Sequence, residues 1–294
     1  MSSTLRVSLC LMALGMSLIN PALAQTQSVP NPPTSSEVND LAAALGAAAS
    51  EEEQDRLLAQ KPGLMNRSLL AALKALAETF FRKGAYAQTL RICQLAVRIA
   101  ERIGDRVALG NALCDLGFLY FLLNRSAQAL DHYQKGLVIF EEAGDKNGKA
   151  TALAGFGSVN FNQRRFDQAL DYFEKSLALS EEVGDRKLTS WILSGLGGAH
   201  IALGHYDLGL ESLQKSRAIS EELNDKLALQ VVMNNIATLY TDYGRYTDAL
   251  EYLHKSLKIL EEWGYSARKR SLAIGFINIA RIYSRQGDAD QALE

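Results

Sequence analysis

The side chains best suited to catalysis or metal binding are few in this chain, which has 4 histidines and 3 cysteines among 294 residues. None of the histidines has the spacing that places two imidazoles on one helical face beside a carboxylate. The sequence also has no Ser, His and Asp arrangement, no glycine-rich phosphate loop and no nucleophile elbow. It therefore predicts a protein that is not an enzyme, with no catalytic, cofactor-binding or metal-binding residues. The histidines are His132, His200, His205 and His254.

Two cysteines, Cys93 and Cys114, flank the turn Gly104-Asp105 at similar distances along the chain. They would lie level with each other across an antiparallel pair of helices. A disulfide is compatible with an oxidising compartment, whereas free cysteine is a common core residue. The sequence does not supply the Cβ geometry that a disulfide requires, so both states stay open.

The first 24 residues have the composition of a secretory signal peptide. Arg6 is their only charge, an apolar run extends from Val7 to Ile19, and the small-residue site Ala22-Leu23-Ala24 follows. The apolar run is shorter than the ~20 residues that span a bilayer. We therefore expect cleavage before Gln25, a secreted or periplasmic protein, and no membrane insertion afterwards.

Two segments lie between the signal peptide and the repeats. Residues 25–35 are polar and proline-rich, which is typical of a flexible linker. Residues 36–65 read as a helical leader, in which Ser50 and Glu53 form a capping box for a helix that stops at Lys61-Pro62-Gly63.

From residue 66 to residue 294 the sequence repeats itself with a period of 40. Gly104-Asp105, Gly144-Asp145, Gly184-Asp185 and Asn224-Asp225 mark turns between repeats. A second turn lies within each repeat, for example at Gly204-His205-Tyr206. Between these turns the apolar residues follow helical spacing. Each repeat is therefore predicted to be two antiparallel helices, with five full pairs and a truncated sixth.

Small residues recur at fixed registers, as expected where two helices approach closely. Glycine inside a helix costs about 1 kcal/mol relative to alanine, so its recurrence argues for close packing. The positions are Ala77, Gly117, Gly157, Gly197, Ala237 and Ala280 in the first helices, and Ala129, Ala169, Gly209, Ala249 and Ala292 in the second.

This pattern resembles the tetratricopeptide repeat, most clearly in Leu113, Leu116, Gly117 and Tyr120 followed by Ala129 and Tyr133. The resemblance implies an all-α, right-handed superhelical solenoid of antiparallel helix pairs. The period of 40 and the glutamates at the end of each second helix are similar to the longer repeats of kinesin light chains. They are also similar to those of bacterial arrays linked to caspase-like peptidase domains.

The resemblance implies that the first helices line a concave groove that holds a protein or an extended peptide. Carried over by register, the groove residues are Asn111, Phe118, Phe121, Phe161, Trp191, Ile201, Asn234, Asn235, Thr238, Asn278 and Arg281. In the longer repeats a ladder of asparagines binds the peptide backbone. Only Asn235 and Asn278 match that ladder, and Asp115 departs from it. For each of Phe118, Phe121 and Phe161, covering a seam between repeats is an equal alternative.

Charge narrows the classes of partner. There are 31 Lys and Arg against 33 Asp and Glu, a net charge of -2, so nucleic acid is not expected to bind. An acid precedes a lysine by four residues in each second helix from Asp131 and Lys135 onward, which predicts a solvated outer face.

The leading hypothesis is an extracytoplasmic protein- or peptide-binding scaffold without a cofactor. The alternatives are the regulatory or substrate-recruiting arm of a secreted protein with a caspase-like peptidase domain beyond residue 294, and self-association through the open last repeat.

Overall fold

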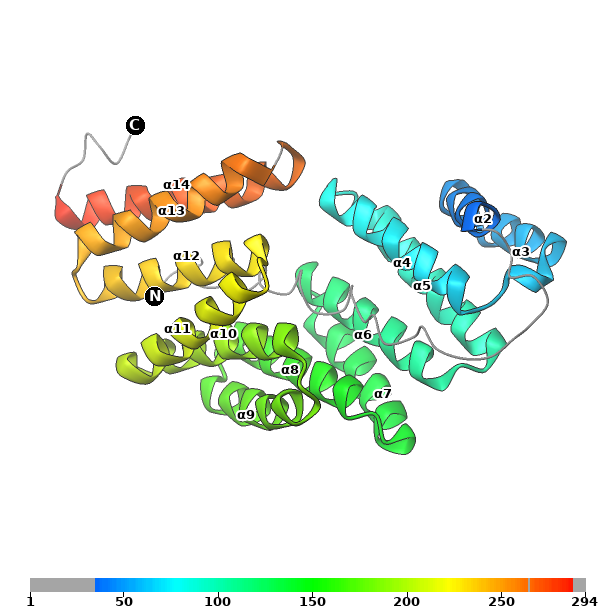
Figure 1. Cartoon of the computed structure of the whole chain (residues 1–294), viewed down its shortest axis with the longest axis horizontal. Helices are drawn as coiled ribbons and strands as arrows, with labels where there is room; N and C mark the ends of the chain where they lie inside the picture. Colours follow the sequence, from blue (N-terminus) through cyan, green and yellow to red (C-terminus); the bar gives the residue numbers. More distant parts are fainter. Residues whose placement is uncertain (1–34, 264, 288–294) are drawn as a thin grey trace. The chain divides into compact units, whose positions relative to one another are not determined.

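The computed structural model describes residues 35–263 and 265–287, and every regular element in these residues is helical (Figure 1). They contain 13 α-helices, one 3-10 turn and no strand. The all-α fold class is therefore confirmed. The signal peptide and the second helix of the sixth pair lie outside the described residues.

The helices follow the order that the repeats predict. The leader consists of α2 (Ser35–Ala47), α3 (Glu51–Gln60) and the 3-10 turn η2 (Pro62–Leu64). The first helices of the pairs are α4 (Arg67–Arg82), α6 (Arg106–Leu122), α8 (Lys146–Asn162), α10 (Arg186–Ala202), α12 (Lys226–Asp242) and α14 (Tyr265–Gln286). The second helices are α5 (Tyr86–Ile103), α7 (Ser126–Ala143), α9 (Phe166–Val183), α11 (Tyr206–Glu222) and α13 (Tyr246–Trp263).

The described chain forms two compact units, with the boundary inside α8 between Gly148 and Lys149. The N-terminal unit holds the leader and the helices α4 to α7, and the C-terminal unit holds the rest of α8 and the helices α9 to α14. Within each unit, helices that follow each other along the chain pack together, as α6 does with α7 and α10 with α11. In the C-terminal unit α10 also packs on α12, so successive first helices are neighbours.

Two residues form each turn between repeats: the first ends the preceding helix and the second caps the next one. Gly104, Gly144 and Gly184 adopt left-handed backbone conformations with φ of 69°, 68° and 71° and end the second helices. The aspartate that follows caps the next helix: Asp185 Oδ1, for example, accepts a hydrogen bond from the backbone N–H of Leu188 at 2.9 Å. The predicted turns between repeats are confirmed.

Small residues bring the two helices of a pair together, as the sequence predicts. A Cβ added to Gly157 would lie 2.7 Å from the ring of Phe173, and one added to Gly197 would lie 2.7 Å from Leu213. Contacts this short cannot be accommodated without movement of the partner. Close packing therefore requires glycine at these positions, although glycine is unfavourable within a helix.

Buried hydroxyl groups connect the second helix to the first helix in three successive pairs. Ser176 Oγ donates to the carbonyl oxygen of Ala150 at 2.7 Å, and Ser216 Oγ donates to that of Ser190 at 2.6 Å. In the third pair Ser256 Oγ lies 3.4 Å from the equivalent carbonyl oxygen, that of Gln230. All three serines are buried. These bonds satisfy polar groups in the core and fix the register of the two helices.

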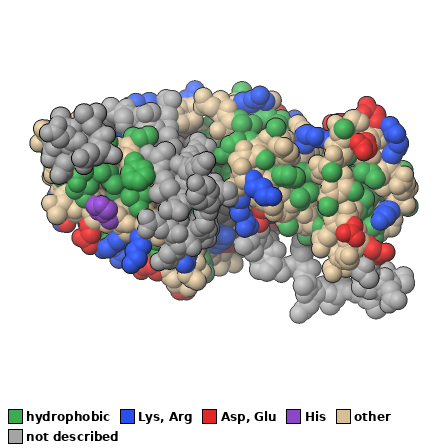
Figure 2. Space-filling model, turned by 90° about the horizontal axis from the view of Figure 1, so that it is seen from above, with side chains coloured by type: hydrophobic (Ala, Val, Ile, Leu, Met, Phe, Trp, Pro, Cys, Tyr) green, Lys and Arg blue, Asp and Glu red, His purple; other side chains and the backbone are tan. Residues whose placement is uncertain are grey.

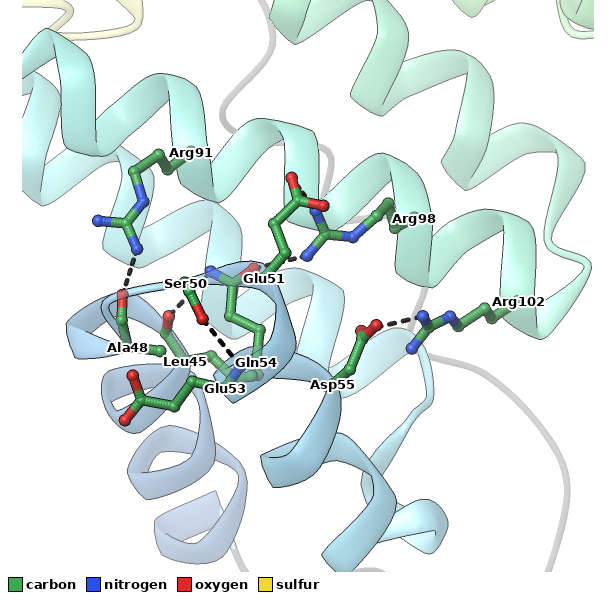
Figure 3. Close-up of polar contacts among 10 residues, drawn as sticks. All are labelled: Leu45, Ala48, Ser50, Glu51, Glu53, Gln54, Asp55, Arg91, Arg98 and Arg102. Atoms are coloured by element: carbon green, nitrogen blue, oxygen red, sulfur yellow. Dashed lines mark hydrogen bonds and ion pairs between the residues drawn. The ribbon is translucent and has the colours of Figure 1, made fainter.

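The leader packs against α4 and α5 in the N-terminal unit, and arginines of α5 hold it there (Figure 3). Arg91 donates to the carbonyl oxygen of Ala48. Arg98 donates to Gln54 Oε1 at 2.5 Å and pairs with Glu51 at 2.7 Å. Arg102 pairs with Asp55 Oδ1 at 2.9 Å.

The start of α3 has the predicted cap. Ser50 Oγ accepts a hydrogen bond from the backbone N–H of Glu53, and Glu53 Oε2 accepts one from Ala49. The helix ends at Gln60, directly before Lys61 and Pro62, as expected.

The leader covers a face of α5 that is exposed in the later second helices. Residues 91, 95, 98 and 102 share one side of α5, since they are spaced by four, three and four positions. Leu95 lies on this side and is 0% exposed. Forty residues later the same register holds Lys135, which is exposed and pairs with Asp131 at 2.8 Å. This face of α5 thus packs against another part of the chain, whereas the equivalent face of α7 is exposed to solvent.

Candidate functional site

The predicted groove residues all lie on first helices, but they are divided between the two units. Asn111, Phe118 and Phe121 are on α6 in the N-terminal unit. In the C-terminal unit α8 carries Phe161, α10 carries Trp191 and Ile201, α12 carries Asn234, Asn235 and Thr238, and α14 carries Asn278 and Arg281.

The apolar members of this set are largely enclosed by the stack. Trp191 is 7% exposed and packs edge-on against Phe173, with ring centroids 6.1 Å apart. Phe161 is buried and packs on Phe166, the first residue of its partner helix, at 5.4 Å. Ile201 belongs to the core of the C-terminal unit. Their placement favours a packing role, so truncating Phe161 or Trp191 would test stability together with binding.

The aromatic residues of α6 are also partly or fully enclosed. Phe121 is buried, and Phe118 is half-buried with its ring 6.1 Å from that of Phe81 on α4. Phe118 thus contacts the preceding pair, whereas Phe161 packs within its own pair, and both interpretations of Phe118, Phe121 and Phe161 remain predictions.

Neighbouring polar residues on α12 point in different directions. Asn234 Oδ1 accepts a hydrogen bond from Ser256 Oγ of α13 at 3.2 Å, so this side chain is directed to the second helix and not to a groove. Thr238 Oγ1 donates to the carbonyl oxygen of Asn234 in its own helix. Asn235 Nδ2 donates to Ser194 Oγ of α10 at 3.3 Å. Asn235 therefore links two successive first helices, α10 and α12.

Asn278 occupies the position of Asn235 in the next first helix, and its amide is unpaired. The side chain is 2% exposed, and neither Nδ2 nor Oδ1 has a hydrogen-bond partner in the structure. Leaving a buried amide unsatisfied costs about 1–3 kcal/mol, so such a group stands out as a binding group. Arg281 lies one turn further along α14 and is half-buried. Burial lowers the pKa of its guanidinium, and the nearby Arg285 lowers it further.

The N-terminal unit contains a cavity of about 450 Å³ between α4, α5 and α6. The predicted groove residue Asn111 contributes to it, whereas Phe118 and Phe121 do not. Alanine, leucine, isoleucine and valine side chains make its apolar walls, and charged side chains are grouped on α4 and α6. Its lining residues include Arg67, Ala71, Lys74, Ala75, Glu78, Cys93, Asp105, Val107, Ala108, Asn111 and Asp115.

Asp115 is the main polar group of this cavity. Its Oδ2 lies 3.8 Å from Lys74 Nζ, which is a long ion pair, and its Oδ1 is buried without a hydrogen-bond partner. Burial raises the pKa of the Asp115 carboxyl; the Lys74 ammonium opposes this shift and the Glu78 carboxylate adds to it. In the sequence, Asp115 was noted only as a departure from the asparagine ladder. An acid on the otherwise apolar face of α6 was the signal that could have identified it.

Cys93 and Cys114 lie close to Asp115, and both are free and buried in the structure. Burial and the nearby Asp115 carboxylate raise the pKa of both thiols. These thiols are therefore poor nucleophiles at neutral pH.

The described part of the chain shows no group of three or more His, Cys, Asp or Glu side chains placed to hold a metal ion. None of its helices is long and apolar enough to cross a membrane. His200 lies beside His205, with ring centroids 5.9 Å apart, and its Nδ1 has no hydrogen-bond partner. Burial lowers the pKa of His200, and repulsion from His205 adds to this shift.

The surface carries both signs of charge. The four predicted acid–lysine pairs of the second helices are all formed on exposed side chains: Asp131 with Lys135, Asp171 with Lys175, Glu211 with Lys215, and Glu251 with Lys255. On the face seen in Figure 2, basic and acidic side chains are interspersed among the described residues.

Stacked helix pairs with these packing residues define a repeat solenoid. The tetratricopeptide repeat model matches residues 68–142, 148–223 and 227–294, which is most of the chain. The chain belongs to the tetratricopeptide repeat family. It is an all-α helical scaffold of a type suited to protein binding. No curated protein matches it.

Solved structures share the fold at low sequence identity. BtubC (BKLC) from P. vanneervenii has a TM-score of 0.58 and 19% identity, covering 71% of this chain and 87% of that one. A Rap protein complexed with competence and sporulation factor has a TM-score of 0.64 and 11% identity, covering 92% and 86%. A Podosopora anserina protein with kinesin light chain TPR-like repeats has a TM-score of 0.50 and 16% identity, covering 64% and 91%. The resemblance to kinesin light chain repeats is thus supported at the level of the fold.

Proposed function

We propose that this protein is an extracytoplasmic scaffold that holds an extended peptide segment of a partner protein along its first helices. The observation that carries the proposal is the unpaired, buried amide of Asn278, one repeat beyond Asn235 at the same register. An asparagine amide offers both a donor and an acceptor, which is what a peptide backbone requires. The Rap protein of this fold was crystallised with a bound factor, which is compatible with a ligand-holding role.

Replacing Asn278 with alanine is expected to weaken partner capture by about 1 kcal/mol or more, since hydrogen bonds to the held backbone are lost. The same change removes an unsatisfied buried amide, so the free energy of unfolding should stay equal or rise. Asn235→Ala should weaken capture less, because Asn235 already bonds Ser194. The measurement is a quantitative pull-down from the extracytoplasmic fraction of the native host, paired with thermal unfolding of each variant.

The matched control is the double variant Lys175→Ala with Lys215→Ala on the exposed second helices. Both lysines make exposed ion pairs, which contribute little, so capture should be nearly unchanged. If this pair abolished capture while the asparagine variants did not, the partner would bind the second helices and the proposal would fail.

The extracytoplasmic location rests on the signal-peptide sequence alone. We expect material isolated from the native host to begin at Gln25, because the small-residue site Ala22-Leu23-Ala24 directs cleavage there. N-terminal sequencing decides this. A product that retains Met1 and the apolar run would show that the protein is not processed for export.

A further inference from the structure

The cavity of the N-terminal unit combines apolar walls with a few charged side chains. Its volume of about 450 Å³ is within the range of small-molecule pockets. Its apolar walls combine the small side chains of Ala71, Ala75 and Ala108 with larger ones, and such walls suit an aliphatic stem. The larger side chains are Leu70, Leu73, Ile92 and Val107. The polar groups lie on α4 and α6 and determine which head group such a stem could carry.

Most charges of the cavity are already paired. Arg67 pairs with Asp105, and Glu78 pairs with Arg82 at 3.0 Å. Lys74 and Asp115 remain, and their charged groups face each other with 3.8 Å between Lys74 Nζ and Asp115 Oδ2.

Asp115 has unused capacity to accept hydrogen bonds. Its Oδ1 has no partner, and Lys74 Nζ approaches its Oδ2 only to 3.8 Å, beyond hydrogen-bond distance. A buried carboxylate in this state is unfavourable and would be stabilised by a donor that carries positive charge. The nearby Glu78 adds negative potential.

We propose that this cavity binds a cationic head group on an aliphatic stem, an alkylammonium or guanidinium, with Asp115 as its acceptor and the small residues of α4 and α6 around the stem. Lysine or arginine side chains of a held peptide are one source of this chemistry, and free amines are the other. The inference rests on the proposed function only for the peptide source.

The test is isothermal titration of the mature full chain with N-acetyl-lysine methylamide. N-acetyl-norleucine methylamide is the uncharged probe with a similar stem, and N-acetyl-glutamate methylamide is the anionic probe. We expect the lysine probe to bind at least about tenfold more tightly than the norleucine probe, as a charged hydrogen bond allows. Equal binding of these two probes would overturn the proposal, as would tightest binding of the glutamate probe.

Two variants with opposite expected effects separate the roles of the charges. Asp115→Asn keeps the shape and removes the charge, so it should abolish the preference for lysine over norleucine. Lys74→Gln removes the competing ammonium and should strengthen binding of the lysine probe several-fold. The exposed Lys135→Gln on α7 is the control and should change nothing. Weaker lysine binding in Lys74→Gln would contradict the assignment.

The source is decided with a capped pentapeptide that has lysine at its centre. Tighter binding of this peptide than of the single-residue lysine probe supports a held segment, whereas equal binding overturns the peptide source. These titrations do not involve Asn235 or Asn278. If the pull-down failed while the lysine probe still bound, the proposed function would be refuted and the cavity proposal would hold. If partner capture succeeded while the lysine probe did not bind, the cavity proposal would be refuted and the proposed function would hold.

Discussion

Replacing Phe173 with alanine is expected to destabilise the C-terminal unit by about 3–5 kcal/mol, the range for large aromatic residues in cores. Phe173 is 0% exposed, and its ring lies between two glycines of neighbouring first helices, Gly157 and Gly195. Glycines have no side chains that could move into the void, so the cavity term should be large. Denaturant unfolding followed by far-UV circular dichroism measures the loss. Val183→Ala, which truncates an exposed residue on the same helix, should change stability by no more than about 0.5 kcal/mol.

The contact between the Phe173 ring and Gly157 can be tested with a double variant. Gly157→Ala should destabilise the native protein, because the added Cβ would lie 2.7 Å from the Phe173 ring. In the Phe173→Ala background the space is free, and alanine is favoured over glycine in a helix by about 1 kcal/mol. The substitution should therefore change sign and become stabilising. If its effect were the same in both backgrounds, the glycine would not be explained by this ring.

Leu95→Lys is expected to release the leader from α5 and to destabilise the N-terminal unit by at least about 3 kcal/mol. The change removes a fully buried leucine and places an ammonium group in its site, and each effect is unfavourable. Hydrogen exchange across residues 35–64 gives the direct measurement, since amides of a released leader lose protection.

The reverse exchange at the equivalent position is the control. Lys135→Leu breaks one exposed ion pair with Asp131 and should cost no more than about 0.5 kcal/mol. The two positions share one register of the repeat, but Leu95 is buried and Lys135 is exposed. Unchanged protection of the leader in Leu95→Lys would show that this face of α5 does not hold it.

The sequence was sufficient for the repeat architecture because the signals for it are local. The left-handed glycine at residue 184 and the aspartate cap at residue 185 depend only on a few neighbouring backbone groups. The pairs of Asp131 with Lys135 and of Asp171 with Lys175 depend only on spacing within one helix. Such features are predictable from the order of residues in a single stretch of chain.

The candidate site was less predictable because it depends on where each side chain points and on how far neighbouring helices bury it. Asn234 and Asn235 are adjacent, but one contacts Ser256 of the second helix and the other contacts Ser194 of the preceding first helix. A step of one residue turns a side chain by about 100° around the helix. A register error of one position therefore assigns a side chain to the seam between first helices when it lies in the core of its own pair. Trp191 was expected at a binding surface, whereas its placement against Phe173 encloses it.

The leader contacts were also not predicted, although the sequence carried a signal for them. At positions 91 and 95 the chain has Arg and Leu where the later repeats have an acid and a lysine. A break in a repeating surface pattern at the first repeat marks the place where something other than a repeat packs.

The spacing of the buried serine contacts has a consequence for how this chain can change in evolution. Each Ser-to-carbonyl bond joins residues 26 apart, and the ion pairs of Arg106 with Glu142 and of Arg186 with Glu222 join residues 36 apart. In each case both partners fall within the same 40-residue block between two turns that separate repeats. Duplication or deletion of a whole block therefore carries both partners of each such contact together. Insertion of one residue within a helix separates them and rotates every later side chain away from its contact. Genes that encode this family member are thus expected to lengthen or shorten by multiples of 120 nucleotides, and to tolerate few other insertions between these turns.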